Sequence, residues 1–289
     1  MESSQVTTWP SPAKLNLFLH ITGRRSNGYH ELQTVFQFLD YGDILSFEPT
    51  LSSNIQLMMQ IDGVEHDSNL IVRAARALQQ HAGITKGVRI SLDKRLPMGG
   101  GLGGGSSNAA TTLVALNQLW DCQLSDDELA KIGLELGADV PIFIHGHAAW
   151  AEGVGEKLSP ISPAEPWYVV IVPPCQVSTS EIFSATELTR DCEPITISRF
   201  LSGEGRNVCE DVVKDHYPAV AESLSWLAQY GQARMTGTGA CVFVDVNSQQ
   251  QAQKIMGDLP ELWQGFVAKG CNSSPLNLHL TKDFKKKKS

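Results

Sequence analysis

The chain has 289 residues, of which 42% are hydrophobic and 19% charged, and its net charge is −8. This composition is typical of a globular chain that is long enough for one large domain or two ordinary ones. The acidic excess speaks against a nucleic-acid-binding surface, and no apolar run approaches the roughly 18 residues that cross a bilayer. The six cysteines form no C-x-x-C pair, and no signal peptide is recognisable, so we expect a cytoplasmic protein with reduced thiols.

The first half of the chain mixes predicted strands and helices. Residues 13–22 alternate apolar and polar side chains, which predicts a half-buried strand, and a turn is expected at 23–28. Ser125 and Glu128 form a capping box that predicts the start of a helix. The other elements expected here are strands at 34–39, 43–48 and 55–62, a helix at 69–81, a strand at 88–92 and a helix at 106–120.

The second half begins after a break at 159–166 that is rich in proline. The predicted order from there is strand, helices, two strands, helix and strand, which is the ferredoxin-like plan. We therefore expect an α+β protein of two domains, 1–160 and 161–282, with a cleft between them and a disordered basic tail at 283–289. The elements expected after the break are a strand at 167–172, helices at 206–216 and 218–230, strands at 232–236 and 241–246, a helix at 248–257 and a strand at 264–268.

The stretch from Pro97 to Ala110 is the most informative in the chain. It holds six glycines in the seven positions 99–105, followed by two serines. Bare backbone lets several N–H groups point at one anion, and the N-terminus of the following helix adds a partial positive charge. A flexible linker is the alternative, but a strand before the glycines and a helix after them favour a phosphate cradle.

Two common glycine motifs fit this stretch poorly. A P-loop ends in Gly-Lys-Ser/Thr, and no lysine lies inside this loop. The dinucleotide fingerprint G-x-G-x-x-G is matched by Gly99, Gly101 and Gly104, but a second helix follows instead of the parallel strand that such a unit needs. We therefore expect a phosphate site of another kind.

Other residues could contribute chemistry. Lys14 is either a cation beside a phosphate or a reacting hydroxyl, or else a solvated lysine at a strand end, and Asn16 lies two residues further on the same face. Asp139 either caps the apolar segment 140–144 or orients a hydroxyl group. The turn at 236–240, taken alone, is more typical of a hairpin than of a binding site.

Taken together, these motifs resemble those of the GHMP kinase superfamily in both order and spacing. The resemblance covers nearly the whole chain and implies an N-terminal domain of the ribosomal S5 domain 2-like type and a C-terminal ferredoxin-like domain. Further segments are similar to the branch of the superfamily whose substrate carries a cytidine diphosphate group. The segments that carry the resemblance are Pro12–Asn16, Pro97–Ala110, Gly137–Pro141 and Thr236–Ala240, and for the branch Asn27–Leu32, Asp93–Pro97 and Phe266–Gly270.

The resemblance implies ATP-dependent phosphorylation, with Mg²⁺, of the 2-hydroxyl of a methylerythritol group in the non-mevalonate route to isoprenoid precursors. Lys14 and Asp139 would be the catalytic pair. ATP would be bound by Lys94, Pro97, Met98, Gly99, Gly100, Gly101, Leu102, Gly103, Gly104, Gly105, Ser106 and Ser107. The substrate would be bound by Asn16, Tyr29, His30, Asn69, Thr179, Phe183, Thr238 and Gly239, with Tyr29 and Phe183 stacking on cytosine and His30 hydrogen-bonding to it.

Some alternatives stay open at the level of the sequence. Either Ser106 or Ser107 could hold Mg²⁺. A carboxylate whose pKa is about 4 is a weak base for an alcohol, so we hypothesise that Asp139 mainly aligns the hydroxyl and takes its proton late. The rival functions are another GHMP kinase, acting on a sugar, mevalonate or homoserine, and a nucleotide-binding sensor without catalysis. We expect no nucleic-acid partner and no stable membrane association, and a homodimer is compatible with the sequence.

Overall fold

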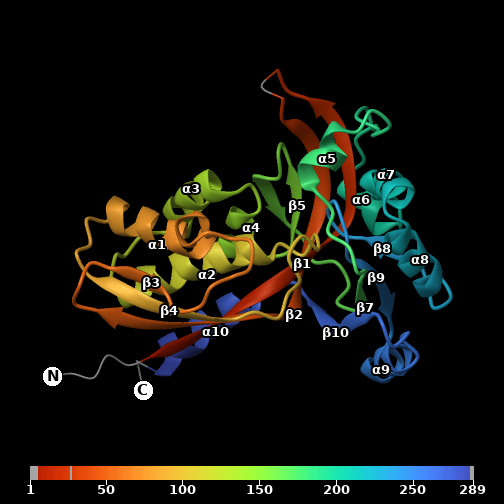
Figure 1. Ribbon diagram of the computed structural model, residues 1–289. Coiled ribbons are helices and arrows are strands. Elements are labelled where there is room, and N and C mark those ends of the chain that lie inside the picture. Colours follow the sequence, from red (N-terminus) through yellow and green to blue (C-terminus); the bar gives the residue numbers. More distant parts are fainter. Residues whose placement is uncertain (1–5, 27, 287–289) are drawn as a thin grey trace.

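The computed structural model describes the backbone of residues 6–26 and 28–286 and the side chains up to residue 281. Two lobes lie side by side, and a long hairpin rises between them (Figure 1). The hairpin consists of β1 (Thr7–Arg24) and β2 (His30–Thr50), which pair antiparallel from Thr7 with Phe47 to Arg24 with His30, with three shifts of register. Asn27, in the turn expected at 23–28, lies outside the described residues.

The strand β2 is a single element where the sequence predicts two. Gly42 lies between the predicted segments 34–39 and 43–48, but it does not interrupt the strand. A Cβ atom at Gly42 would lie 2.1 Å from the carbonyl oxygen of Ser11, so this glycine allows β1 and β2 to approach closely. The strand expected at 55–62 is much shorter, because the chain turns back at Ile61 and Val64, and only β3 (Ile55–Leu57) remains.

The N-terminal lobe is a sheet covered by helices. Beyond the hairpin its strands are β3, β4 (Gly87–Asp93), β5 (Ala149–Glu152) and β6 (Lys157–Pro160). Its helices are η1 (His66–Ser68), α1 (Leu70–His81), α2 (Gly104–Leu119), α3 (Asp126–Leu136) and α4 (Val140–His145). Ser125 caps α3 with the capping box that the sequence predicts. The hydrophobic core of the lobe lies between helices and sheet and includes Phe38, Phe47 and Leu113.

The C-terminal lobe has the ferredoxin-like plan that the sequence predicts. Its strands lie in the order β10-β7-β9-β8, all antiparallel. They are β7 (Trp167–Val172), β8 (Arg234–Met235), β9 (Val242–Val246) and β10 (Gln264–Cys271). The helices are α5 (Thr179–Ser184), α6 (Ile197–Leu201), α7 (Cys209–His216), α8 (Pro218–Leu227) and α9 (Gln249–Gly257).

Two elements join the lobes. The end of β10 pairs with β2 through Gly270 and Cys271, so that one sheet runs through both lobes. After it, α10 (Pro275–Lys286) packs back on β1 and β2 (Figure 1). This helix extends into the range 283–289, where the sequence analysis expects a disordered tail; lysine is a strong helix former, which accounts for the difference up to Lys286. Residues 287–289 lie outside the described part of the chain.

Candidate active site

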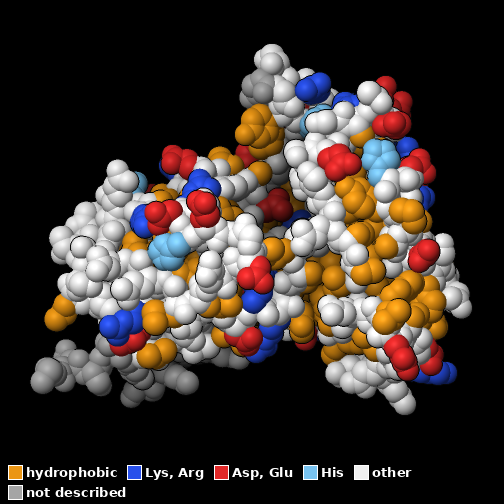
Figure 2. All heavy atoms as spheres, viewed as in Figure 1, with side chains coloured by type: hydrophobic (Ala, Val, Ile, Leu, Met, Phe, Trp, Pro, Cys, Tyr) orange, Lys and Arg blue, Asp and Glu red, His pale blue; other side chains and the backbone are white. Residues whose placement is uncertain are grey.

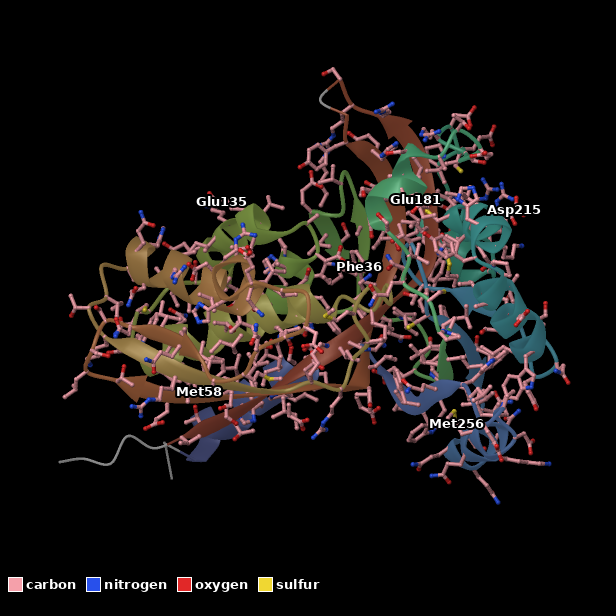
Figure 3. All side chains as sticks on the ribbon, in the orientation of Figure 1. Phe36, Met58, Glu135, Glu181, Asp215 and Met256 are labelled. Carbon is pink, nitrogen blue, oxygen red and sulfur yellow. The ribbon has the colours of Figure 1, made fainter. Side chains whose placement is uncertain are left out.

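A cleft of about 600 Å³ opens between the two lobes. Figure 2 shows this hollow on the face of the molecule, and Figure 3 places Phe36, which lines the cleft, between the lobes. The lining comes from both ends of the chain: the glycine loop and the start of α2, the strands β1 and β2, the junction before α4, the start of α5 and the turn after β8. Most of the residues that the sequence predicts for the site are among them.

The glycine loop adopts a backbone conformation that would be strained for residues other than glycine. Gly99, Gly101 and Gly103 have φ angles of +65°, +73° and +72°. A Cβ atom at Gly101 would lie 2.1 Å from the carbonyl oxygen of Thr236, and one at Gly103 would lie 2.8 Å from the ring of Phe143. Glycine is therefore required at these two positions by both conformation and space.

The N-terminus of α2 opens into the cleft. Its N-cap is Gly103, which offers no side-chain acceptor to the first turn of the helix. Backbone N–H groups in this turn, together with the helix dipole, form an anion site of the kind that binds phosphate. A Cβ at Gly104 would lie 3.5 Å from the ammonium of Lys94, so a cation lies beside this turn. The bare backbone and the cation suit a nucleoside triphosphate.

Lys94 is held in place by a residue that the sequence analysis does not select. Asp43 is fully buried and accepts from Lys94 Nζ at 2.9 Å. Its other oxygen accepts from the backbone N–H groups of Arg95 and Leu96. Asp43 therefore fixes the segment that leads into the glycine loop. A single aspartate inside a predicted strand carries no sequence signal for this role.

The two serines after the glycines have different surroundings. Ser106 lines the cleft. Ser107 is fully buried, and its hydroxyl is hydrogen-bonded to that of Ser11 at 2.9 Å on the far side of the helix. Of the two, only Ser106 can therefore reach a ligand in the cleft. The residues described include no group of three or more His, Cys, Asp or Glu side chains that could hold a metal ion.

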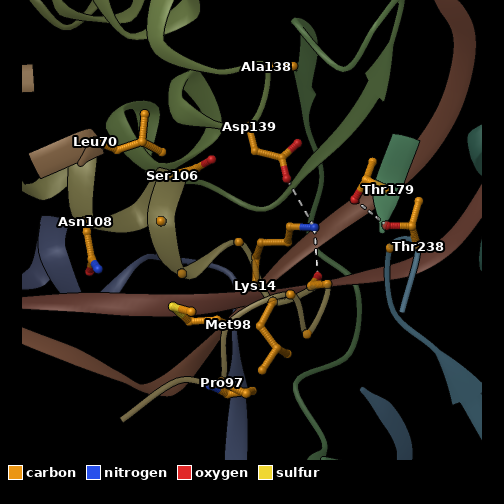
Figure 4. A pocket seen from close by; sticks show the side chains of 18 of the residues that line it. Lys14, Leu70, Pro97, Met98, Ser106, Asn108, Ala138, Asp139, Thr179 and Thr238 are labelled. Atoms are coloured by element: carbon orange, nitrogen blue, oxygen red, sulfur yellow. Dashed lines mark hydrogen bonds and ion pairs between the residues drawn. The ribbon is translucent and has the colours of Figure 1, made fainter. Parts of the chain in front are cut away.

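Lys14 and Asp139 meet at the centre of the cleft. Lys14 Nζ lies 3.3 Å from Asp139 Oδ2 (Figure 4), although the two residues come from β1 and from the junction between α3 and α4. The side chain of Lys14 is 3% exposed, and that of Asp139 is 34% exposed. Asp139 occupies the N-cap position of α4 but makes no side-chain capping bond. The capping alternative for this residue is therefore wrong, and its carboxylate faces the lysine.

Lys14 also has fixed partners on its own side of the cleft. Its ammonium donates to Asn16 Oδ1 at 2.5 Å and to the carbonyl oxygen of Gly101 at 3.1 Å. It lies 5.3 Å from the ring centre of Phe36. With three acceptors around it, the ammonium joins β1, the glycine loop and Asp139 into one rigid arrangement. The alternative of a solvated strand-end lysine is wrong.

The turn between β8 and β9 is a hairpin turn and also part of the cleft. Ala240 N and Cys241 N donate to the carbonyl oxygens of Gly99 and Gly100, which fixes the glycine loop. Thr238 lines the cleft, and its hydroxyl is hydrogen-bonded to that of Thr179 at 2.8 Å (Figure 4). Gly239, which the sequence analysis includes among the substrate-binding residues, is not part of the lining, and its N–H donates to the carbonyl oxygen of Thr236 within the turn.

The outer end of the cleft carries the aromatic residues. Phe183 lines it, and the ring of His30 stacks on Phe183 with 5.1 Å between ring centres and an interplanar angle of 18°. His30 and Tyr29 lie at the hairpin tip, outside the lining itself, and Tyr29 is 62% exposed. Asn69 lines the cleft, and its Oδ1 caps α1 by accepting from Ile71 N.

Two family models match this chain, "GHMP kinases N terminal domain" over residues 69–147 and "GHMP kinases C terminal" over residues 193–265. A 4-diphosphocytidyl-2-C-methyl-D-erythritol kinase from Nitrosococcus oceani is 58% identical over 268 residues, which are 93% of this chain and 96% of the relative. A protein of the same name from Shewanella baltica is 58% identical over 274 residues, 94% of this chain and 96% of the relative.

Solved structures have the same fold. A crystal structure of 4-(cytidine 5'-diphospho)-2C-methyl-D-erythritol kinase matches with a TM-score of 0.80 and 32% identity, over 91% of this chain and 99% of that one. A mevalonate kinase structure matches with a TM-score of 0.67 and 17% identity, over 93% of this chain and 100% of that one, which shows a shared fold. None of the helices in the described part of the chain is both long and apolar enough to cross a membrane.

Proposed function

We infer that this chain, which belongs to the 4-diphosphocytidyl-2-C-methyl-D-erythritol kinase family of the GHMP kinases, phosphorylates the 2-hydroxyl of 4-diphosphocytidyl-2-C-methyl-D-erythritol with ATP. The products are the 2-phosphate and ADP, and the reaction belongs to the non-mevalonate pathway of isoprenoid precursors. The observation that carries the assignment to this cleft is the Lys14–Asp139 pair, 3.3 Å apart beside the glycine loop. An ammonium and a carboxylate at that separation suit an alcohol that must be aligned with a phosphoryl group.

The glycine loop and the first turn of α2 would bind the triphosphate of ATP. This proposal is supported by the bare backbone of Gly99, Gly101 and Gly103, which adopts positive φ angles, and by the absence of a side-chain cap on α2. Lys94 would add a positive charge beside this turn. Ser106 would contribute a hydroxyl ligand to Mg²⁺, which neutralises charge on the phosphates when it is bound.

The acceptor hydroxyl would lie against Asp139. Phosphoryl transfer runs through a loose transition state in most analyses, so the alcohol need not lose its proton early. We propose that Asp139 aligns the hydroxyl and accepts its proton late. Lys14 is buried and bound on three sides, so it would hold Asp139 and the glycine loop at a fixed distance while its charge stabilises the moving phosphoryl group.

The cytidine diphosphate group would lie toward the outer end of the cleft. Phe183, Tyr29 and His30 supply the aromatic and hydrogen-bonding groups that a pyrimidine needs. Thr179 and Thr238 would contact the diphosphate or the polyol, together with Asn16 and Asn69. Because His30 stacks directly on Phe183, the base would not fit between the two rings and would lie beside the His30 ring, in its plane, where a ring N–H can reach it.

We also propose a cytoplasmic location for this protein, because its six cysteines are all free thiols.

The test is ADP release with purified protein, ATP, Mg²⁺ and one alcohol at a time. We expect turnover with the cytidylated methylerythritol and at most trace activity with mevalonate, homoserine or galactose. Lys14→Met serves as the inactive control. Turnover of one of the other alcohols in preference would replace this function with that of another GHMP kinase, and tight ATP binding without turnover of any alcohol would indicate a sensor.

A further inference from the structure

Arg190 connects the loop after α5 with the hairpin tip at the outer end of the cleft, a role that the sequence does not predict. It lies in the loop that follows α5, and its guanidinium contacts His30 near the tip of the β1–β2 hairpin. Its Nη2 donates to the carbonyl oxygens of Phe183 at 3.0 Å and Ala185 at 2.6 Å, and its Nη1 donates to that of Leu188 at 3.1 Å. A guanidinium with three backbone acceptors fixes the shape of this loop and the end of α5 that carries Phe183.

The fourth bond of Arg190 reaches the hairpin tip. Its Nε donates to Nε2 of His30 at 3.3 Å. A ring nitrogen that accepts a hydrogen bond carries no proton, so the neutral imidazole of His30 has its proton on Nδ1. Burial, followed by the charges of Arg190 and Arg24, lowers the pKa of His30, which keeps the ring neutral. His30 therefore offers an N–H donor at Nδ1.

The same guanidinium thus controls both members of the stacked pair. It holds Phe183 through the backbone carbonyl and His30 through the ring nitrogen, and the two rings stack at 5.1 Å. N3 of cytosine is a hydrogen-bond acceptor, whereas N3 of uracil carries a hydrogen. A ring that is fixed as an Nδ1–H donor can therefore donate a hydrogen bond to N3 of cytosine. With uracil, the same N–H would face the N3–H group, and two donors cannot form a hydrogen bond.

We propose that Arg190 is a positioning residue of the base-binding end: its guanidinium holds His30 in the Nδ1–H form against Phe183, and thereby favours a cytidine over a uridine substrate. The proposal rests on the function proposed above. Arg190 touches neither ATP nor the reacting hydroxyl in this account, so its removal should weaken substrate binding and base selection and leave the chemical step unchanged.

The first test is the tautomer of His30 in the full-length protein. A long-range ¹H–¹⁵N spectrum of protein labelled at histidine, with His30→Gln to assign the signals, reports which ring nitrogen carries the proton. We expect a protonated Nδ1 and a bare Nε2 at neutral pH, and a shift toward the Nε2–H form in Arg190→Met. A wild-type ring with its proton on Nε2 would overturn the proposal, and this result does not require Arg190→Met to fold.

The second test separates binding from catalysis. In Arg190→Met we expect the KM for the cytidylated substrate to rise about threefold to tenfold, the size of one lost hydrogen bond, with kcat and the KM for ATP unchanged. The preference in kcat/KM for the cytidine over the uridine diphosphate substrate should fall by a similar factor. The matched control is Arg199→Met, since Arg199 pairs with Glu204 on the surface.

The outcomes distinguish this proposal from the function on which it rests. Wild-type protein that fails to turn over the cytidylated substrate contradicts the proposed function, whatever the state of His30. Wild-type protein that is active, combined with an Arg190→Met variant of unchanged KM and base preference, contradicts the role of Arg190 alone. A fall in kcat equal to the rise in KM would indicate a general loss of structure and would also count against it.

Discussion

The hydroxyl of Thr236 donates to the carbonyl oxygen of Gly101 at 3.2 Å, and in this way the C-terminal lobe holds the glycine loop. The same hydroxyl accepts from the backbone N–H of Asn16 at 2.9 Å, and the Gly101 carbonyl also accepts from Lys14. The loop, the cleft lysine and the turn after β8 therefore form one hydrogen-bonded unit. A substitution in any one of the three should therefore shift the position of the other two.

Gly101→Ala should destabilise the protein as well as weaken ATP binding. The new Cβ would lie 2.1 Å from the Thr236 carbonyl oxygen, in a backbone with φ of +73°. We expect the free energy of unfolding to fall by about 1–3 kcal/mol, measured by urea denaturation. Gly105→Ala is the matched control, because its Cβ would meet only Leu70, at 3.4 Å, and alanine favours the helix. Equal stability of the two variants would contradict the packing argument.

Substitutions at Asp139 distinguish alignment of the hydroxyl from proton removal. Asp139→Ala should lower the single-turnover rate about 10²–10⁴-fold, because both roles are lost. Asp139→Asn keeps an oxygen that can accept from the hydroxyl, so we expect it to retain about tenfold more activity than the alanine variant. If asparagine is no better than alanine, alignment is not the main role of this residue. Unchanged thermal unfolding of both variants serves as the control.

Ser106 and Ser107 form a matched pair for the role of Mg²⁺. Ser106→Ala should raise the Mg²⁺ concentration for half-maximal activity at least about tenfold, because the hydroxyl in the cleft is lost. Ser107→Ala should leave that concentration unchanged and lower the free energy of unfolding by about 1 kcal/mol, because its hydroxyl is buried against Ser11. The reverse pattern would show that the wrong serine has been assigned.

The pH dependence of substrate binding should reflect His30. Burial and two arginines lower the pKa of this imidazole, so it stays neutral as the pH falls through its ordinary value of about 6.5. We therefore expect a constant KM for the cytidylated substrate from pH 8 down to about pH 6.5 and a rise only at lower pH. His30→Gln cannot titrate and should lose this rise. A KM that already climbs on going from pH 8 to pH 7 would contradict a lowered pKa.

Local patterns in the sequence were sufficient to predict much of the secondary structure of this protein. The alternation at 13–22, the capping box at Ser125 and the glycines before α2 each depend on neighbours within a few residues, and the structure contains the strand, the helix and the turn that they predict. The ferredoxin-like order of the C-terminal lobe follows from such elements in sequence. Residue types limit local backbone geometry strongly, so these features can be predicted without knowledge of the tertiary structure.

Only the tertiary structure decided between the alternative roles of single side chains in the cleft. Asp139 could have been a helix cap, Ser106 and Ser107 were equivalent, and neither Asp43 nor Arg190 gave a signal, because partners far away in the sequence set their roles. Burial and hydrogen-bond geometry depend on how β1, the glycine loop and the C-terminal lobe pack together. Contacts across the chain therefore determine the chemistry of residues whose local structure the sequence alone could predict.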